Sequence, residues 1–293
     1  MYPELNLFGL KIDMYTIFLC IGILAALLSF RFFSDYKKMY WKLQNFSIIV
    51  AVFSIVGGYG SAVLFQAFYN FLDDTSKGFQ INSGTGATFY GGLIGGAGLF
   101  LALYFGLGKL FFKNKEHING FFDIANIAAA AIAAAHGFGR IGCFMAGCCY
   151  GKPTDAWYGV YFSSYGIKAV PVQLFEAIFL FALFGFFWYR LVKRKSCNLP
   201  LYMMLYGVWR FVIEFFRSDD RGATIVKFLS PSQLIAILMV IGAVGLFFGE
   251  RYMEKKMANK ALEAESVSDE SESDLSNDDV KSEKKDEKNE DQD

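Results

Sequence analysis

IANIAAAAIAAAHGFGR, residues 124–140, is the stretch that decides the fold of this chain. Alanine fills eight of its seventeen positions, and two glycines precede the final arginine. Small side chains let neighbouring membrane helices approach closely. The stretch therefore predicts a helix in the middle of a bundle, with Arg140 at one end of it.

The rest of the chain has the composition of a membrane bundle. Of its 293 residues, 54% are hydrophobic and 18% aromatic. That excess is too large for a single soluble core. We expect an all-α integral membrane protein with about seven spans. The expected spans cover roughly residues 14–33, 46–68, 89–111, 121–141, 171–190, 200–217 and 231–249.

Lysine and arginine predict the orientation, because short basic loops stay on the cytoplasmic side. Fifteen of them lie in one alternating set of segments, residues 31–42, 109–120, 190–198 and 251–260. Eight lie in the other set, residues 1–13, 70–88, 140–170 and 217–230. We expect the N-terminus outside and the C-terminus in the cytoplasm, so that polar chemistry gathers toward the outer side.

The C-terminal segment differs in charge from the rest. Residues 250–293 hold 16 acidic and 8 basic side chains, whereas residues 1–249 hold 12 acidic and 20 basic ones. Such a segment, poor in large apolar residues, is typical of disorder. We expect a membrane domain over residues 1–250 and a disordered, net acidic cytoplasmic tail over residues 251–293. Residues 14–30 lack a small-residue cleavage site after them and predict a retained span.

The end of the central span and the loop that follows it form the most polar stretch, HGFGRIGCFMAGCCYGKPT, residues 136–154. Arg140 has two readings: its guanidinium extends to water, or it binds the phosphate of a lipid with paired hydrogen bonds. Gly139 and Gly142 leave space beside it, which favours the second.

Further charged residues fall inside later spans. Arg210 and Glu214 are four residues apart and Arg217 follows, so we expect a ladder on one helical face. Gln173 and Glu176 share a face of the preceding span, and Glu176 requires a cationic partner such as Arg140, Arg210 or Arg217. Charges within a membrane span are paired or line a wet cavity, which favours a functional site.

Two other features leave alternatives open. FYGGLIGG, residues 89–96, is either a helix-packing face or a lipid-binding cleft that begins at Tyr90. Cys143, Cys148 and Cys149 are packing thiols, an outward-facing redox pair or a transient nucleophile. Metal binding is the least favoured reading, because neither His117 nor His136 completes a ligand pattern with them.

Together these motifs resemble the prolipoprotein diacylglyceryl transferase family. The resemblance covers about residues 10–250 and rests on their order along the chain: FYGGLIGG, then GRIGCF with GCCYGKPT, then PVQLFE, then RFVIEFFR. It implies a seven-span enzyme of the bacterial inner membrane. That family transfers the diacylglyceryl group of phosphatidylglycerol to the lipobox cysteine of a prolipoprotein, and glycerol phosphate leaves.

The resemblance also implies roles for residues. Arg140 matches the arginine that binds the phosphatidylglycerol head group, and Glu176 matches the carboxylate after the Pro-x-Gln-Leu turn. Tyr15 matches a family tyrosine. The remaining matches are the charged residues of the later span, Arg210, Glu214 and Arg217. We further expect Gly139, Gly142, Gly91, Gly92 and Gln173 to contact the lipid, and no cofactor or resident metal.

Five positions depart from the family pattern. Tyr90 stands where the family has histidine before Gly91 and Gly92, and Cys143 replaces an asparagine. Cys148, Tyr59 and Val170 replace an acidic residue, an arginine and a histidine. The family base is thus replaced. His136, one turn before Arg140, is either the base or a packing residue. Tyr90 would act as a hydrogen-bond donor more readily than as a base, because the ordinary pKa of tyrosine is about 10. The alternatives to the transferase are a changed acceptor or lipid, or a non-catalytic lipid-binding scaffold.

Overall fold

The computed structural model describes residues 4–7, 10–82, 84–163, 165–217 and 229–290. Within these residues seven helices are long and apolar enough to cross a membrane, which confirms the predicted fold class. They are α1 (Met14–Tyr36), α2 (Trp41–Asp73), α3 (Phe89–Phe111), α5 (Phe121–Ala146), α6 (Val172–Val192), α7 (Asn198–Ile213, extended by the 3₁₀ turn η2, Glu214–Phe216) and α8 (Pro231–Glu290). The short helix α4 spans Glu116–Asn119, and a second 3₁₀ turn, η1, spans Thr75–Lys77.

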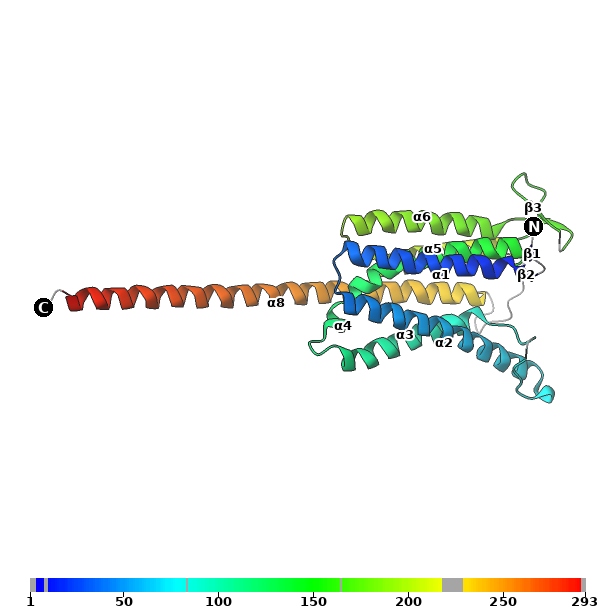
Figure 1. Cartoon of the computed structure of the whole chain (residues 1–293). Helices are drawn as coiled ribbons and strands as arrows, with labels where there is room; N and C mark the ends of the chain where they lie inside the picture. The colour runs from blue at the N-terminus through cyan, green and yellow to red at the C-terminus, as the bar shows by residue number, and fades with distance from the viewer. Residues whose placement is uncertain (1–3, 8–9, 83, 164, 218–228, 291–293) are drawn as a thin grey trace.

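The alanine-rich helix α5 is the centre of the bundle, as its composition predicts. It packs against α1, α6 and α7, while α8 packs on α7, and α2 and α3 form a separate hairpin (Figure 1). A Cβ on Gly22 of α1 would lie 2.8 Å from the Ala135 carbonyl oxygen. The backbones of α1 and α5 can approach this closely only because that position has no side chain.

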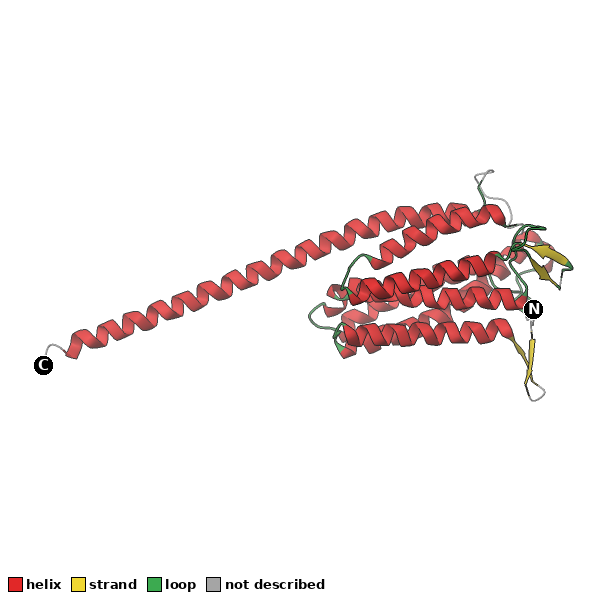
Figure 2. Cartoon of the chain, turned by 90° about the horizontal axis from the view of Figure 1, so that it is seen from above, coloured by secondary structure: helices red, strands yellow, loops and turns green. Residues whose placement is uncertain are grey.

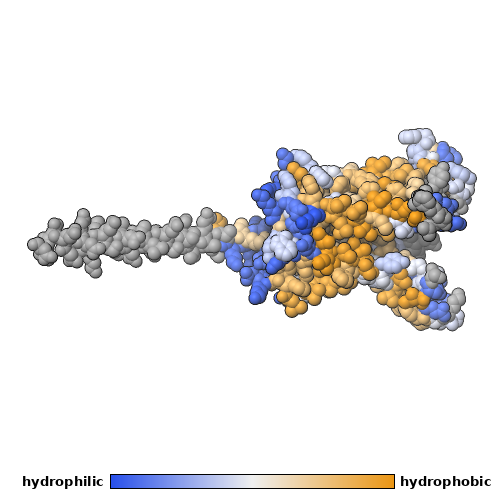
Figure 3. Space-filling model, in the orientation of Figure 1, coloured by the Kyte–Doolittle hydropathy of each residue, from blue (hydrophilic) through white to orange (hydrophobic). Residues whose placement is uncertain are grey.

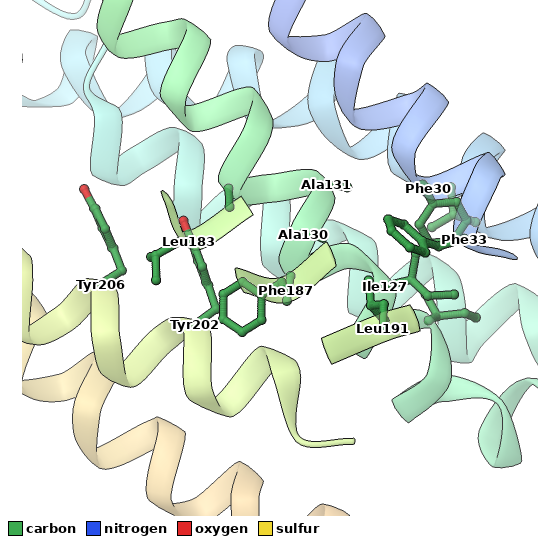
Figure 4. Close-up of a cluster of buried hydrophobic side chains, with 14 of the residues drawn as sticks. Phe30, Phe33, Ile127, Ala130, Ala131, Leu183, Phe187, Leu191, Tyr202 and Tyr206 are labelled. Atoms are coloured by element: carbon green, nitrogen blue, oxygen red, sulfur yellow. The ribbon is translucent and has the colours of Figure 1, made fainter. Parts of the chain in front are cut away.

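Large side chains from the surrounding helices fill the space that the alanines leave. Phe33 of α1, Phe187 and Leu191 of α6, and Ile127 of α5 are fully buried in one cluster (Figure 4). Lipid tails are as apolar as these side chains, so close van der Waals packing, rather than removal from water, holds the cluster together.

The outside of the bundle is apolar. Leu28, Val56 and Ile178 are each more than 60% exposed. On the face seen in Figure 3, a broad hydrophobic band covers the helices, with hydrophilic surface at both ends of the bundle. Such a band is expected of a surface that faces lipid.

Two antiparallel hairpins lie at one end of the bundle, here named the strand end (Figures 1 and 2). Strand β1 (Glu4–Leu7) pairs with β2 (Leu10–Asp13), with Glu4 opposite Asp13. Strand β3 (Val160–Phe162) pairs with β4 (Ile167–Ala169), with Val160 opposite Ala169. The opposite end, from which α8 projects, is named the tail end.

Helix α8 continues beyond the bundle to Glu290 (Figure 1). Its apolar part ends by Lys260, and the charged segment follows as a continuation of the same helix. The disorder that the composition predicts for this segment stays a prediction. The division into a membrane domain and a separate charged tail remains a prediction.

Candidate functional site

The centre of the site is an ion pair between α5 and α6 at the strand end. Arg140 Nε lies 3.0 Å from Glu176 Oε2, and the Glu176 side chain is fully buried. A buried carboxylate without a cation would carry a large desolvation penalty. Of the three cationic partners expected for Glu176, the structure places Arg140 in direct contact.

Two tyrosines and a histidine enclose this ion pair. Tyr206 of α7 donates a hydrogen bond of 2.8 Å to Glu176 Oε1. The His136 ring packs edge-on against Tyr206, with Nε2 3.9 Å from Glu176 Oε1. Its Nδ1 lies 3.4 Å from the Tyr202 hydroxyl. Tyr202 and Tyr206 project from the same side of α7 (Figure 4). Together these groups fix the carboxylate that holds Arg140.

A second charged group, centred on Arg210, lies beside the first. Its Nη2 lies 2.7 Å from Glu214 Oε2 and donates to Ser232 Oγ at 2.9 Å. Tyr90 donates to the same serine oxygen at 2.7 Å, which joins α3 to α8. Arg210 Nη1 is buried and has no hydrogen-bond partner among the described residues. Arg210 also lies near enough to Glu176 for their charges to interact.

The predicted ladder on one helical face is wrong for Arg217. Helix α7 ends at Ile213, and the 3₁₀ turn η2 follows, so Arg217 has extended backbone. Its backbone bridges to Gly151, and the Phe216 carbonyl accepts from the Lys152 N–H at 2.8 Å. Arg217 is therefore buried, and its backbone pairs with the loop after α5 instead of continuing the helical face of Arg210.

The glycines of the predicted lipid site have different surroundings. A Cβ on Gly91 would lie 2.5 Å from Phe65 Cβ, and one on Gly92 would lie 3.3 Å from Ala62 Cβ. Both therefore face α2. Gly142 packs against Tyr15 and Phe18 of α1, whereas a Cβ on Gly139 would meet nothing within 4 Å. The open space expected beside Arg140 is thus at Gly139.

The three clustered cysteines are brought together by the end of α5. Gly147 has a φ of +74°, and this left-handed turn lets the Cys148 N–H donate to the Cys143 carbonyl. Gln173 Nε2 donates to the Cys148 carbonyl oxygen at 2.5 Å. All three thiols are free, and their Sγ atoms lie within 4.8 Å of one another. Hydrogen bonds from Cys143 and Cys148 lower the pKa of Cys149, and the Arg217 guanidinium beside it lowers that pKa further.

Four residues of the site are absent from the sequence-based prediction: Tyr202, Tyr206, Ser230 and Ser232. The spacing of Tyr202, Tyr206 and Arg210 at four-residue intervals places them on one helical face, a signal that could have identified the tyrosines. Ser230 precedes the proline that begins α8, a typical cap position. Its hydroxyl accepts from the Gln233 N–H and donates to Glu214.

The fold and site together define a multi-pass membrane protein with a buried, donor-rich site at one end of its bundle. A family model described as prolipoprotein diacylglyceryl transferase matches residues 4–249. The chain belongs to this family.

Named relatives are similar over most of their length. A phosphatidylglycerol–prolipoprotein diacylglyceryl transferase 2 of Clostridium perfringens is 35% identical, over 83% of this chain and 92% of that protein. The phosphatidylglycerol–prolipoprotein diacylglyceryl transferase of Clostridium tetani is 35% identical, over 85% and 98%. That of Francisella tularensis subsp. novicida is 31% identical, over 83% and 92%.

Proposed function

We propose that this chain transfers the diacylglyceryl group of phosphatidylglycerol to the lipobox cysteine thiol of prolipoproteins, as an enzyme of lipoprotein maturation. The observation that carries the proposal is the pair of arginines at the strand end. Arg140 and Arg210 come from different helices, each is held by a carboxylate, and Arg210 has a buried donor without a partner among the described residues. An anionic phosphate matches this surplus of donors.

The reaction needs an electrophilic carbon with a good leaving group. As the bond from the glyceryl carbon to oxygen breaks, negative charge gathers on the phosphate that leaves. Fixed guanidinium donors stabilise charge that develops in a transition state. Arg140 and Arg210 would bind this phosphate, while Glu176 and Glu214 hold the two guanidinium groups in place. Gly139 would leave room for the lipid head group.

The remaining predicted site residues have supporting roles in this proposal. Tyr90 would fix Ser232 beside Arg210, and Gln173 would hold the loop that carries Cys148. Arg217 would contribute positive charge at that loop, and Tyr15, which packs on Gly142, would hold α1 against this end of α5. Gly91 and Gly92 would act indirectly, by letting α3 pack closely on α2. His136 is the candidate base, within reach of Glu176 and two tyrosine hydroxyls.

We place the strand end on the outer side of the bacterial cytoplasmic membrane. The basic segments expected on the cytoplasmic side, such as residues 37–42 and 190–195, lie at the tail end. A prolipoprotein that crosses the membrane with its signal peptide would then meet the site on the outer side. A cysteine-reactive, membrane-impermeant reagent applied to intact cells should modify position 163 in Ser163→Cys and should not modify position 115 in Lys115→Cys, with the modified position located by peptide mapping.

Transfer of a labelled diacylglyceryl group to a lipobox peptide tests the function. Arg140→Ala should lower the rate about 100-fold or more, the effect typical of removing a transition-state donor. Arg251→Ala is the matched control, because that arginine is exposed on α8 and lies away from the site. Undiminished transfer by a folded Arg140→Ala protein would contradict the role of Arg140.

Two further experiments separate the alternatives. Rescue of a transferase-depleted bacterium by this chain is expected, whereas failure of rescue at normal membrane levels would favour a changed acceptor or a lipid-binding scaffold. His136→Gln removes the imidazole but keeps a hydrogen-bonding side chain. Wild-type turnover in that variant would exclude His136 as the base.

A further inference from the structure

The three-cysteine cluster is held in one conformation by the backbone around it. Gly147 and Cys149 both have positive φ, +74° and +63°. A left-handed conformation is unfavourable for a residue other than glycine, and it persists only where surrounding contacts impose it. Gln173 is fully buried and supplies such a contact through the Cys148 carbonyl. The cluster is therefore a built arrangement and not a chance meeting of side chains.

Its dimensions fit a soft metal ion. Zinc–sulfur bonds are about 2.3 Å long, which places the sulfurs of a tetrahedral site about 3.8 Å apart. The three Sγ atoms already lie within 4.8 Å of one another and come from both sides of a tight turn. Three protein ligands with an open fourth position are typical of catalytic zinc sites, while closed structural sites use four.

The charges around the cluster favour the same reading. Three thiolates and one zinc ion carry a net charge of −1. Arg217 lies beside Cys149, and Arg140 is near enough to Cys143 for their charges to interact. The sequence-based expectation of no metal relied on the lack of a histidine in the pattern. Three converging sulfurs make a histidine ligand unnecessary.

From this geometry we infer that Cys143, Cys148 and Cys149 bind one zinc ion, whose fourth position takes the thiol of the acceptor cysteine. The metal site stands on the cluster alone, and its role toward the acceptor rests on the proposed transferase function. A bound zinc ion would let the acceptor thiol lose its proton without relying on the candidate base His136.

The step balances without an oxidant or reductant. On binding the metal, the acceptor thiol gives up its proton to water, because a coordinating thiol is deprotonated. The sulfur then forms a bond to the glyceryl carbon, and the bond from that carbon to the phosphate oxygen breaks. The electron pair leaves on glycerol phosphate, whose charge faces Arg140 and Arg210. The thioether product is a weaker ligand than a thiolate and leaves the fourth position.

Metal content of the full-length protein, purified from membranes in mild detergent, is the first test. We expect about one zinc ion per chain, lost in Cys148→Ser and in Cys149→Ser. Cys20→Ser is the matched control, because Cys20 is exposed on α1, and it should retain the metal. Zinc-free wild-type protein, zinc retained by both cluster variants, or an intact mass that shows a disulfide within the cluster would each overturn the metal site.

Cobalt substitution tests the fourth position without any variant and without turnover. The cobalt-loaded wild-type protein should show thiolate-to-cobalt charge-transfer absorption, and a lipobox peptide should increase and shift it. The same peptide with serine in place of cysteine should leave the spectrum unchanged. If the cysteine peptide leaves the cobalt absorption unchanged, the proposed binding of the acceptor thiol to the metal is wrong.

The two proposals fail in different ways. If the transferase function is wrong, zinc content and cobalt absorption are still as expected, but labelled lipid never reaches the peptide. If the metal inference is wrong, the purified protein contains no zinc, and transfer proceeds at the wild-type rate after treatment with a zinc chelator.

Discussion

Two buried polar clusters, one at each end of the bundle, differ in whether a hydrogen-bond donor or an acceptor is left without a partner among the described residues. At the tail end, Glu250 Oε1 accepts from Asn126 at 2.6 Å and from the Cys197 N–H at 2.9 Å. Asn126 Oδ1 accepts from the Asn198 N–H at 2.5 Å. These acceptors satisfy the free N–H groups where α7 begins, so the cluster is a helix cap built from distant residues.

Among the described residues, the atom left without a partner at the tail end is an acceptor, Glu250 Oε2, whereas at the strand end it is a donor of Arg210. The carboxylates of the strand-end cluster, Glu176 and Glu214, pair with Arg140 and Arg210, and within the part of the chain that the structure describes one buried N–H donor of Arg210 has no partner. A cluster whose acceptors meet backbone groups stabilises the fold. A cluster with donors left over is prepared for an anion. Burial of charge alone does not separate the two; the balance of donors and acceptors does.

The largest expected difference comes from neutralising one carboxylate in each cluster. Glu176→Gln leaves Arg140 buried without its counter-charge, and we expect transfer to fall about 100-fold. Glu250→Gln at the tail end should change the rate per folded molecule less than about threefold, since it touches no part of the site. Labelled-lipid transfer by both purified variants makes the comparison. Equal losses would remove the distinction between the clusters.

Stability should respond in the reverse order. Asn126→Ala removes a donor to Glu250 and an acceptor for Asn198, and leaves a buried N–H unpaired. We expect a loss of about 1–3 kcal/mol for the unsatisfied group, measured as a lower unfolding temperature in detergent. Ser61→Ala, which removes a single hydrogen bond to Gly91, is the smaller control. An unchanged unfolding temperature for Asn126→Ala would count against the cap.

A milder change tests the edge of the strand-end cluster. Tyr90→Phe removes the hydrogen bond to Ser232 while the ring remains, so Arg210 keeps its direct pair with Glu214. We expect a fall in transfer of about tenfold or less, as for an ordinary neutral hydrogen bond. Steady-state kinetics at varied lipid concentration would check it. A loss as large as that of Arg140→Ala would mean that Tyr90 acts directly in the chemistry.

The smallest effect concerns pH and lies at the tail end. Burial lowers the pKa of His117 below its ordinary value of about 6.5, and the charge of Lys109 lowers it further. The unfolded chain therefore binds a proton more readily than the folded one. The unfolding temperature should fall slightly as pH drops below about 6.5, and less so in His117→Gln. An equal fall in both proteins would show that another group is responsible.

Sequence reasoning identified the helices, and it predicted that Glu176 pairs with Arg140, Arg210 or Arg217, because these signals are local; the structure shows the pair with Arg140. Apolar length defines a span, alanine content defines the middle helix, and a glutamate inside a span demands a cation. It was wrong for Arg217 because the departure from α-helix at Ile213 depends on the pairing of Phe216 and Arg217 with the loop after α5. The packing of Gly91 against Phe65, likewise, depends on α2, which no pattern around the glycine reveals.

Because the chain leaves the α-helix at Ile213, the short segment from Arg210 to Arg217 connects two separate contacts: Arg210 contacts Ser232, and Arg217 contacts Cys149. We expect the position of Arg217 to depend on the length of this segment more than on the identity of most of its side chains. Phe215 and Phe216 are 58% and 51% exposed, so exchanges among apolar residue types should be tolerated there. Insertion or deletion of a single residue would turn Arg217 by about 100° and separate it from Cys149. In natural variants of this chain, the segment should change in composition and never in length.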